Sequence, residues 1–260
     1  MAETANGRPE VVVTAEQGVM VITINRPHAK NAVTLAVAEG VAAALDELDA
    51  RDDLAVGIIT GAGGTFCAGM DLKAFLRGER PSLPDRGFAG ITEAPPATPL
   101  IAAVEGYALA GGCEIVLACD MVTAGRGARF GIPEAKRGLV AAAGGLLRLP
   151  ERIPRAVAME LALTGGFLDA PRAYDLGLVN RLTNDGSALD EALELAHAIA
   201  ANGPLATRAS KRVIVESRGW PVAERFARQR EIIEPVMTSE DAREGARAFA
   251  EKRPPNWQGR

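Results

Sequence analysis

Two glycine-rich turns constrain this chain more than any other feature of its sequence. The first runs from Phe66 to Asp71 and the second from Ala108 to Glu114, and each lies between an apolar, strand-like run and a helix-like stretch. A backbone without side-chain bulk can direct its N–H groups at a ligand oxygen. Two such turns could therefore form a binding site for a developing negative charge.

Two glutamates accompany these turns. Glu114 ends the second turn, and Glu134 follows Pro133 further along the chain. An unpaired carboxylate is costly in the apolar run around Glu114, so a solvated position is not expected, and a buried ion pair with an arginine is the structural alternative. Glu134 could equally be an acidic residue in a first helical turn, where it would complement the helix dipole.

Composition limits the classes of function. With 260 residues, of which 48% are hydrophobic, the chain can bury one main core with an appended subdomain. It has 29 Lys and Arg against 33 Asp and Glu, a net charge of −4, so it lacks the basic field typical of nucleic-acid binding. An anionic ligand must therefore be bound by local charges.

No segment indicates secretion, membrane insertion or metal binding. Residues 1–8 lack the apolar core and positive start of a secretory signal, and the apolar run 138–147 is shorter than the roughly 18 to 20 residues that span a bilayer. With two distant histidines and no Cys-x-x-Cys, a metal site is not expected. We expect a soluble, cytoplasmic protein with three buried thiols, those of Cys67, Cys113 and Cys119.

Hydrophobic patterns predict alternating strands and helices. Residues 11–14 and 19–25 predict a β-hairpin that turns near Gly18, and Thr34 is a candidate N-cap for a helix that continues to about Asp49. Further short strands are expected at residues 54–60, 100–105, 121–124 and 178–182. A strand, a glycine turn and a helix that recur in this order predict stacked units in a spiral or a parallel sheet.

Two other regions have distinct compositions. Residues 77–99 contain five prolines and cannot be regular for long, so they form either a mobile flap over a site or a plain surface excursion. From about residue 189 the sequence predicts successive helices, broken at Gly and Pro residues. Their expected ranges are 189–201, 205–217, 222–237 and 239–252.

Five short runs, in order along nearly the whole chain, resemble the crotonase superfamily, and the enoyl-CoA hydratases most closely. They are Asn25–Pro27, Phe66–Lys73, Ala110–Glu114, Phe130–Glu134 and Phe249–Arg253. The resemblance implies an α/β fold, a crotonase-like spiral of ββα units over residues 1–188 that carries the CoA and catalytic site. It also implies that residues 189–260 form a helical region that assembles trimers, often paired into hexamers.

The resemblance also implies a reaction and roles for four residues. The activity would be that of a lyase, the syn addition of water to a 2-trans-enoyl-CoA to give a 3-hydroxyacyl-CoA, with coenzyme A as part of the substrate and no separate cofactor. The amides of Met70 and Gly111 would bind the thioester oxygen, where an enolate-like charge develops. Glu134 would donate a proton to C2 and Glu114 would accept one from water, with coupled titrations.

The substrate-binding residues implied by the resemblance fall into three groups. They are the candidate cations for the CoA phosphates, Arg26, Lys30 and Lys73; the first-turn residues Ala68, Asp71 and Leu72; and Phe249 with Lys252, a pair that a neighbouring subunit would contribute. One departure concerns the water site. Hydratases usually carry Pro-Gly shortly after the second glutamate, whereas this chain has alanines at 141–143, which keep the N–H of Ala142 but would narrow the water pocket.

Other functions remain as alternatives. A sibling enzyme, such as an enoyl-CoA isomerase or a hydroxyacyl-CoA dehydratase, would share the oxyanion turns. A weakly catalytic acyl-CoA-binding protein, or one with an RNA partner, is disfavoured by the two glutamates and by the negative net charge. A dinucleotide fingerprint fails at residues 61–66, because Phe66 stands where its third glycine would fall.

Overall fold

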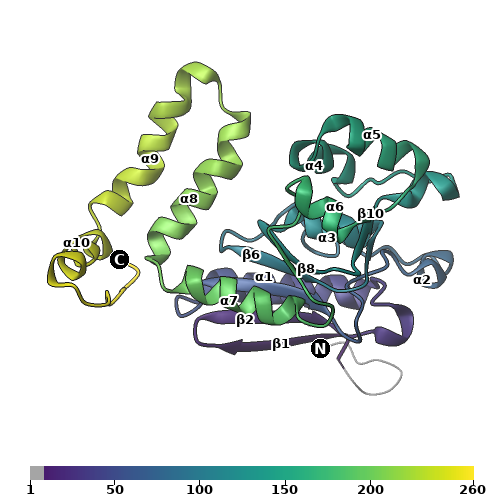
Figure 1. The fold of residues 1–260 in the computed structure, drawn as a ribbon, viewed down its shortest axis with the longest axis horizontal. Helices are drawn as coiled ribbons and strands as arrows, with labels where there is room; N and C mark the ends of the chain where they lie inside the picture. The colour runs from purple at the N-terminus through teal and green to yellow at the C-terminus, as the bar shows by residue number, and fades with distance from the viewer. Residues whose placement is uncertain (1–8) are drawn as a thin grey trace.

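A twisted six-stranded sheet forms the centre of the molecule (Figure 1), in the order β1-β2-β3-β6-β8-β11. The computed structural model describes residues 9–260, so the expectation about a secretory signal in residues 1–8 lies outside it. Strands β1 (Val11–Glu16) and β2 (Val19–Ile24) form the predicted antiparallel hairpin. Its turn residues Gln17 and Gly18 both have positive φ, as a tight hairpin turn requires.

The other strands of this sheet pair in parallel. They are β3 (Val56–Gly61), β6 (Leu100–Val104), β8 (Met121–Gly125) and β11 (Arg181–Thr183). All four were expected, although β11 begins later than the run 178–182 because Leu178 and Val179 pack into the core before the strand starts.

A second, three-stranded sheet lies beside the first, in the order β10-β9-β7. Its strands are β7 (Tyr107–Leu109), β9 (Arg129–Gly131) and β10 (Leu168–Asp169). The chain therefore passes from β6 to β7 and into α3 (Gly111–Ala118), and then from β8 to β9. This repeated step between two sheets confirms the expected spiral of ββα units.

Two helices follow the predicted patterns closely. Helix α1 (Leu35–Ala50) begins at Thr34, whose hydroxyl accepts a hydrogen bond from the Val37 amide at 3.2 Å. Helix α3 is buried along its whole length, so its only charged residue, Glu114, lies inside an apolar helix. Short elements complete this region: η1 (Pro27–Ala29), α2 (Leu72–Leu76) and η2 (Pro133–Arg137).

The proline-rich segment 77–99 is neither a flap nor an excursion over its whole length. It forms a small hairpin of β4 (Ser82–Leu83) and β5 (Gly87–Phe88). Ala89 and Ile91 then have no exposed surface and belong to the main core. The expectation is wrong for residues 87–92, because the apolar side chains there pack inward.

Three helices were not anticipated from the sequence. They are α4 (Gly145–Arg152), α5 (Arg155–Thr164) and α6 (Ala170–Asp175). Pro150 lies inside α4 and glycines precede it, so its helical pattern is weak. Helices α4 and α5 lie together over α3, on the side of the molecule opposite the β1–β2 hairpin (Figure 1).

The C-terminal helices form as predicted, with two different kinds of packing. Helix α7 (Ala188–Ala200) packs on the large sheet through Ala192 and Ala196. The arm, which we define as residues 204–251, extends away from the sheets (Figure 1). Its helices are α8 (Pro204–Glu216), η3 (Ser217–Gly219), η4 (Val222–Glu224), α9 (Arg225–Met237) and α10 (Glu240–Glu251). A domain boundary near residue 188 stays a prediction.

Candidate active site

The two glycine-rich turns lie against each other. The Cys67 amide donates to the Tyr107 carbonyl at 2.8 Å, and the Leu109 amide donates to the Cys67 carbonyl at 3.0 Å. Gly69, with a φ of 97°, is so close to the second turn that a Cβ placed on it would lie 3.3 Å from the Gly111 nitrogen. Glycine at this position therefore meets both a conformational and a packing requirement.

The amides of Met70 and Gly111 are available to a ligand. Around Met70, the Val33 amide binds the Gly69 carbonyl and the Asp71 amide binds the Val33 carbonyl, but within residues 9–260 the Met70 amide has no acceptor. Gly111 is the first residue of α3, so its amide has no partner inside the helix, and no other described residue accepts from it. Two adjacent turns thus each offer one free donor.

Glu114 is held by the backbone of a loop distant in sequence. Its side chain is buried, at 3% exposure, and its Oε1 accepts hydrogen bonds from the amides of Ala143 at 2.7 Å and Gly145 at 2.9 Å. Burial raises the pKa of Glu114, while these two hydrogen bonds and the charge of Arg148 act in the opposite direction. Among the described residues Glu114 has no ion pair, so the alternative of a buried pair with arginine is wrong.

Glu134 shares this region with Glu114. It lies in the first turn of the short helix η2, as the structural alternative proposed, but its Oε2 is buried and has no hydrogen-bond partner in the described chain. Burial raises the pKa of Glu134, and the charge of Glu114 raises it further. Burial, together with the charges of both glutamates, also raises the pKa of Cys113 to about 12. The Glu114 carboxylate is therefore close enough to Glu134 to act on its titration.

The loop of residues 141–145, which contains the three alanines, binds the Glu114 carboxylate through its backbone, a role that was not predicted from the sequence. The amides of Ala143 and Gly145 bind the carboxylate, whereas Ala142 is exposed and, among the described residues, its amide has no acceptor. The only signal that could have indicated this role is the Gly144–Gly145 pair that begins α4.

Arg26 and Asp71 serve the structure of the first turn. The Arg26 guanidinium, in a side chain that is almost fully buried, forms ion pairs with Glu10 and Asp71, each at 3.0 Å, and donates to the Ala32 carbonyl at 2.5 Å. Asp71 also caps α2 by accepting from the Lys73 and Ala74 amides. The guanidinium is therefore already paired with two carboxylates, and contact between Arg26 and a CoA phosphate stays a prediction.

The other predicted binding residues fall in two places. Ala68, Leu72, Lys73 and Lys30 lie on or beside the first glycine turn, and the Lys30 amine stands 5.2 Å from the centre of the Tyr107 ring. Phe249 and Lys252, by contrast, lie at the end of α10, far from α2 and α3 within one chain (Figure 1). The structure of a single chain does not bring this pair to the glutamates.

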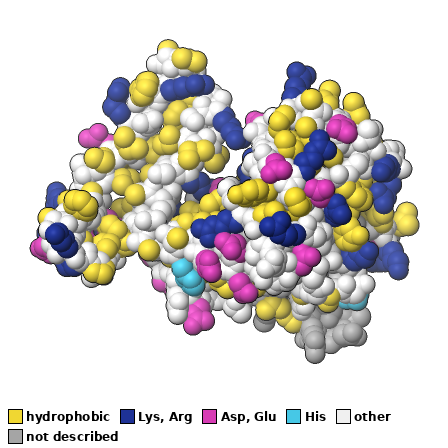
Figure 2. Space-filling view, in the orientation of Figure 1, with side chains coloured by type: hydrophobic (Ala, Val, Ile, Leu, Met, Phe, Trp, Pro, Cys, Tyr) yellow, Lys and Arg dark blue, Asp and Glu magenta, His cyan; other side chains and the backbone are white. Residues whose placement is uncertain are grey.

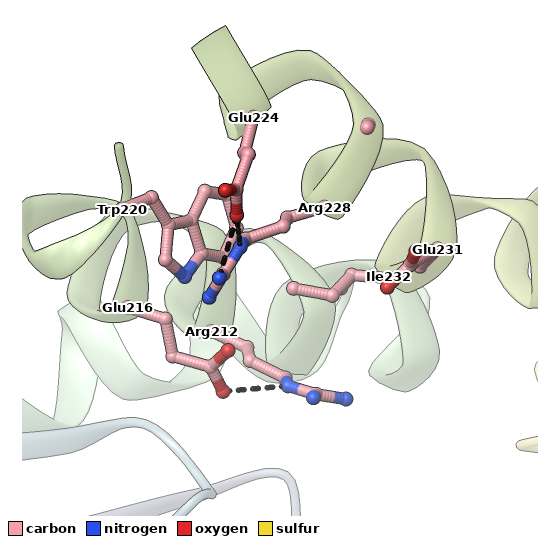
Figure 3. A pocket seen from close by; sticks show the side chains of 8 residues that line it. Arg212, Glu216, Trp220, Glu224, Arg228, Glu231 and Ile232 are labelled. Atoms are coloured by element: carbon pink, nitrogen blue, oxygen red, sulfur yellow. Dashed lines mark hydrogen bonds and ion pairs between the residues drawn. The ribbon is translucent and has the colours of Figure 1, made fainter. Parts of the chain in front are cut away.

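A hollow of about 500 Å³ lies elsewhere, between α8 and α9. Figure 3 shows that charged side chains line it and pair with each other. Arg212 binds Glu216 at 2.7 Å, and Arg228 binds Glu224 at 2.7 Å. Because these arginines are already paired, the hollow offers little to an anionic ligand. Within residues 9–260 no group of His, Cys, Asp and Glu could hold a metal ion, and no helix is long and apolar enough to cross a membrane.

Comparison with known proteins places this geometry in a family. The profile of the enoyl-CoA hydratase/isomerase family matches residues 14–260. Enoyl-CoA hydratase EchA19 of Mycobacterium tuberculosis is 44% identical over 99% of both chains, and a carnitinyl-CoA dehydratase of Salmonella paratyphi A is 41% identical over 95% of this chain and 98% of its own.

Solved structures agree with this assignment. A crystal structure of an enoyl-CoA hydratase from Mycobacterium tuberculosis matches with a TM-score of 0.96 and 61% identity, and that of EchA1 from Mycobacterium marinum with 0.96 and 62%. In both cases the match covers 97% of this chain and 100% of the other. The chain therefore belongs to the enoyl-CoA hydratase/isomerase family and has the crotonase fold.

Proposed function

We propose that the protein is a lyase that hydrates 2-trans-enoyl-CoA to 3-hydroxyacyl-CoA by syn addition of water. One observation carries this proposal: Glu134, whose pKa is raised by the charge of Glu114, occurs together with two touching turns whose Met70 and Gly111 amides have no acceptor among residues 9–260. Relatives named enoyl-CoA hydratase, similar over nearly the whole chain, support it.

The free amides suit the charge that hydration creates. When water adds at C3, electron density moves onto the thioester oxygen, and donors already in place stabilise this enolate-like state more than the ground state. In other enzymes the loss of one such donor costs about 2.7 to 4 kcal/mol. We therefore assign the thioester oxygen to the Met70 and Gly111 amides.

Burial raises the pKa of both glutamates, but the groups that surround them differ. Two backbone amides donate to Glu114, and the charge of Arg148 favours its ionised form. The Oε2 of Glu134 is buried without a donor, which favours a protonated carboxyl. Glu114 would thus accept a proton from water while Glu134 gives one to C2, and the pair would titrate as a unit.

Substrate binding and assembly complete the proposal. Lys30 and Lys73 would meet the CoA phosphates, Ala68 and Leu72 would line the substrate channel, and the Ala142 amide would hold the attacking water. Coenzyme A enters as part of the substrate, and no separate cofactor is proposed. The free thiols of three cysteines are typical of a reducing compartment, which supports a cytoplasmic location.

We also propose a trimer, or a hexamer of two trimers, as the active form. The arm exposes large apolar side chains, visible as yellow patches over its helices in Figure 2. Val222, Phe226, Met237 and Phe249 are between 72% and 88% exposed in the single chain. Contact between subunits would cover this surface and could bring Phe249 and Lys252 to the CoA site of a neighbour.

An enoyl thioester assay tests the function. The protein is mixed with crotonyl-CoA and longer 2-trans-enoyl-CoAs, and the loss of the conjugated thioester absorbance is followed. We expect turnover, with a steep loss in Glu114→Gln and in Glu134→Gln. Tight acyl-CoA binding without turnover would instead favour a binding protein, and migration of the double bond without addition of water would favour an isomerase.

A further inference from the structure

Arg148 occupies a specific position against the loop that holds Glu114. It lies half-buried on α4, and its guanidinium fills the space that a side chain at position 144 would need, because a Cβ on Gly144 would collide with its Nη1. Gly144 also has a φ of 95°, a conformation that side chains disfavour. The turn at Gly144 is thus shaped to accept this guanidinium.

The residues on either side of Gly144 are the ones that bind Glu114. Ala143 and Gly145 donate their amides to its Oε1 at 2.7 and 2.9 Å. A shift of the Gly144 turn would move both donors together. Arg148 therefore contacts the backbone that fixes the carboxylate.

The other side of the guanidinium reaches the opposite half of the site. Its Nη2 donates to the Thr92 carbonyl at 2.7 Å. Thr92 ends the buried segment 87–92, in which the Phe88 ring packs so closely on Gly111 that a Cβ there would collide with the ring. Phe88 thus supports the residue whose amide we assign to the thioester oxygen.

Charged groups surround Arg148, but none of them forms an ion pair with it in the described chain. Within the described chain it forms no ion pair at 4.0 Å or less, and Glu151, Glu114, Cys119 and Arg218 are the titratable groups that act on it. The charge of Arg148 in turn lowers the pKa of Glu114. The pKa of Glu134 is raised by the charge of Glu114 and lowered by that of Arg137. The charge of Arg148 thus acts on the carboxylate that its guanidinium helps to place.

We propose that Arg148 is a positioning residue that fastens the Gly144 turn to segment 87–92, and so keeps Glu114 in a fixed place relative to the Gly111 amide. The inference rests on the proposed hydratase function for its kinetic consequence. The structural part of the inference is that Arg148 positions the Glu114 carboxylate and that its charge favours the ionised form of this carboxylate. This part can be tested without substrate.

Helix α4 offers a matched control. Arg152 lies one turn after Arg148, is also half-buried, and donates to a backbone carbonyl, that of Cys119, at 3.1 Å. Among the described residues, only atoms of Arg148 lie within 4 Å of a Cβ placed on Gly144, and no hydrogen bond joins the Arg152 guanidinium to the Gly144 turn. If Arg148 were merely structural, Arg148→Met and Arg152→Met would have similar effects.

The first test is a ¹³C NMR titration of the glutamate carboxyl groups in the substrate-free protein, with the Glu114 signal assigned by Glu114→Gln. We expect Arg148→Met to raise the pKa of Glu114 by about 1 unit, because an opposite charge nearby favours the ionised form. Arg148→Lys should shift it less, and Arg152→Met should leave it unchanged. An equal pKa of Glu114 in the wild type and in Arg148→Met would overturn the inference.

The second test is steady-state kinetics with crotonyl-CoA over a range of pH. Arg148→Met should lower kcat by about 10- to 100-fold with little change in KM, since a small misplacement of a reacting group has effects of this size. The acid limb of its pH profile should move to higher pH. Arg148→Lys keeps the charge but not the planar fork, so it should lose kcat with little movement of that limb.

The outcomes separate the two proposals. If Arg148→Met does not fold, Arg148→Lys decides, and wild-type kcat in that variant would contradict positioning by the fork. If the wild-type protein hydrates no enoyl-CoA, the proposed function is wrong, while the NMR titration still decides whether Arg148 holds Glu114. Equal kcat losses in the Arg148 and Arg152 variants would overturn the positioning role.

Discussion

The sheets with helices α1–α7 bury a large apolar core, although some of their apolar side chains, such as Leu76 and Leu147, are exposed, whereas the arm of α8–α10 buries few of its residues. In the first region Phe66, Ile59 and Phe130 are almost fully buried, and the free amides and glutamates lie inside this packing. In the arm, α8 and α9 bury none of their residues, and Phe226 is 74% exposed. The candidate acid/base residues are thus packed within one chain, whereas the arm exposes apolar surface of the kind that the proposed trimer would cover.

The largest effect is expected from substitution of either glutamate in the first region, which should abolish most of the activity and leave the assembly through the arm unchanged. Glu114→Gln or Glu134→Gln should reduce kcat for crotonyl-CoA by about 10²- to 10⁴-fold, the usual contribution of a general acid or base. Sedimentation should show the same assembly as the wild type. A variant with near wild-type kcat would remove that glutamate from the mechanism.

The same substitution should have different costs in the two regions. A Cβ on Gly112 would collide with the backbone carbonyl of Cys67, whereas one on Gly219, next to the arm's α8–α9 connection, meets nothing within 4 Å. Gly112→Ala should therefore lower the free energy of unfolding by about 1 to 3 kcal/mol, and Gly219→Ala by less than about 0.5 kcal/mol. Denaturant unfolding of both variants checks this, and equal losses would contradict the packing argument.

A charged side chain introduced into the arm should weaken assembly of the proposed trimer, and should affect the enzyme's activity only through that loss. Phe226→Asp places a carboxylate on the exposed apolar surface and should dissociate the proposed trimer, as measured by sedimentation. KM for acyl-CoA should rise by about tenfold or more if a neighbour supplies Phe249 and Lys252, equivalent to about 1.4 kcal/mol of binding. Val13→Asp, on the outer strand β1, is the control and should change neither. A Phe226→Asp monomer with wild-type KM would show that the site is complete in one chain.

The smallest effect concerns pH and stability. The folded-state pKa of Glu134 is raised above its usual value of 4.5, so the protonated carboxyl is the favoured folded form. Its stabilising contribution is complete below the unfolded pKa and is lost as pH rises through the folded pKa. Glu134→Gln should thus raise Tm relative to the wild type at pH 8 more than at pH 4. An equal difference at both pH values would contradict the raised pKa.

Features encoded by local patterns were predictable from the sequence. The hairpin around Gly18, the Thr34 cap and the helices after residue 188 depend on residues close together in the chain, and the structure confirms them. The glycine turns and the two glutamates were identified by residue type and order. Such features can be recognised because their physical causes act within a few residues.

Features that depend on distant partners were missed or misassigned. Arg26 looked like a free cation because Asp71, which pairs with it, lies far along the chain. Helix α4 was hidden by Pro150 and by glycines that serve Glu114 from a distance. The hydrophobic pattern of the sequence does not predict that Phe88 packs on Gly111 or that Arg148 donates to the Thr92 carbonyl. These contacts exist only once the spiral has closed.

The use of main-chain donors has a consequence for how this enzyme can diversify. The Met70 side chain is not needed for the hydrogen bond that we assign to its amide, so selection can replace it without dismantling the oxyanion turn. Because position 70 adjoins the amide that we assign to the thioester oxygen, a different side chain there could change acyl preference while the catalytic apparatus persists. A saturation library at this codon, screened against enoyl-CoAs of different length, should yield variants with altered chain preference and retained turnover.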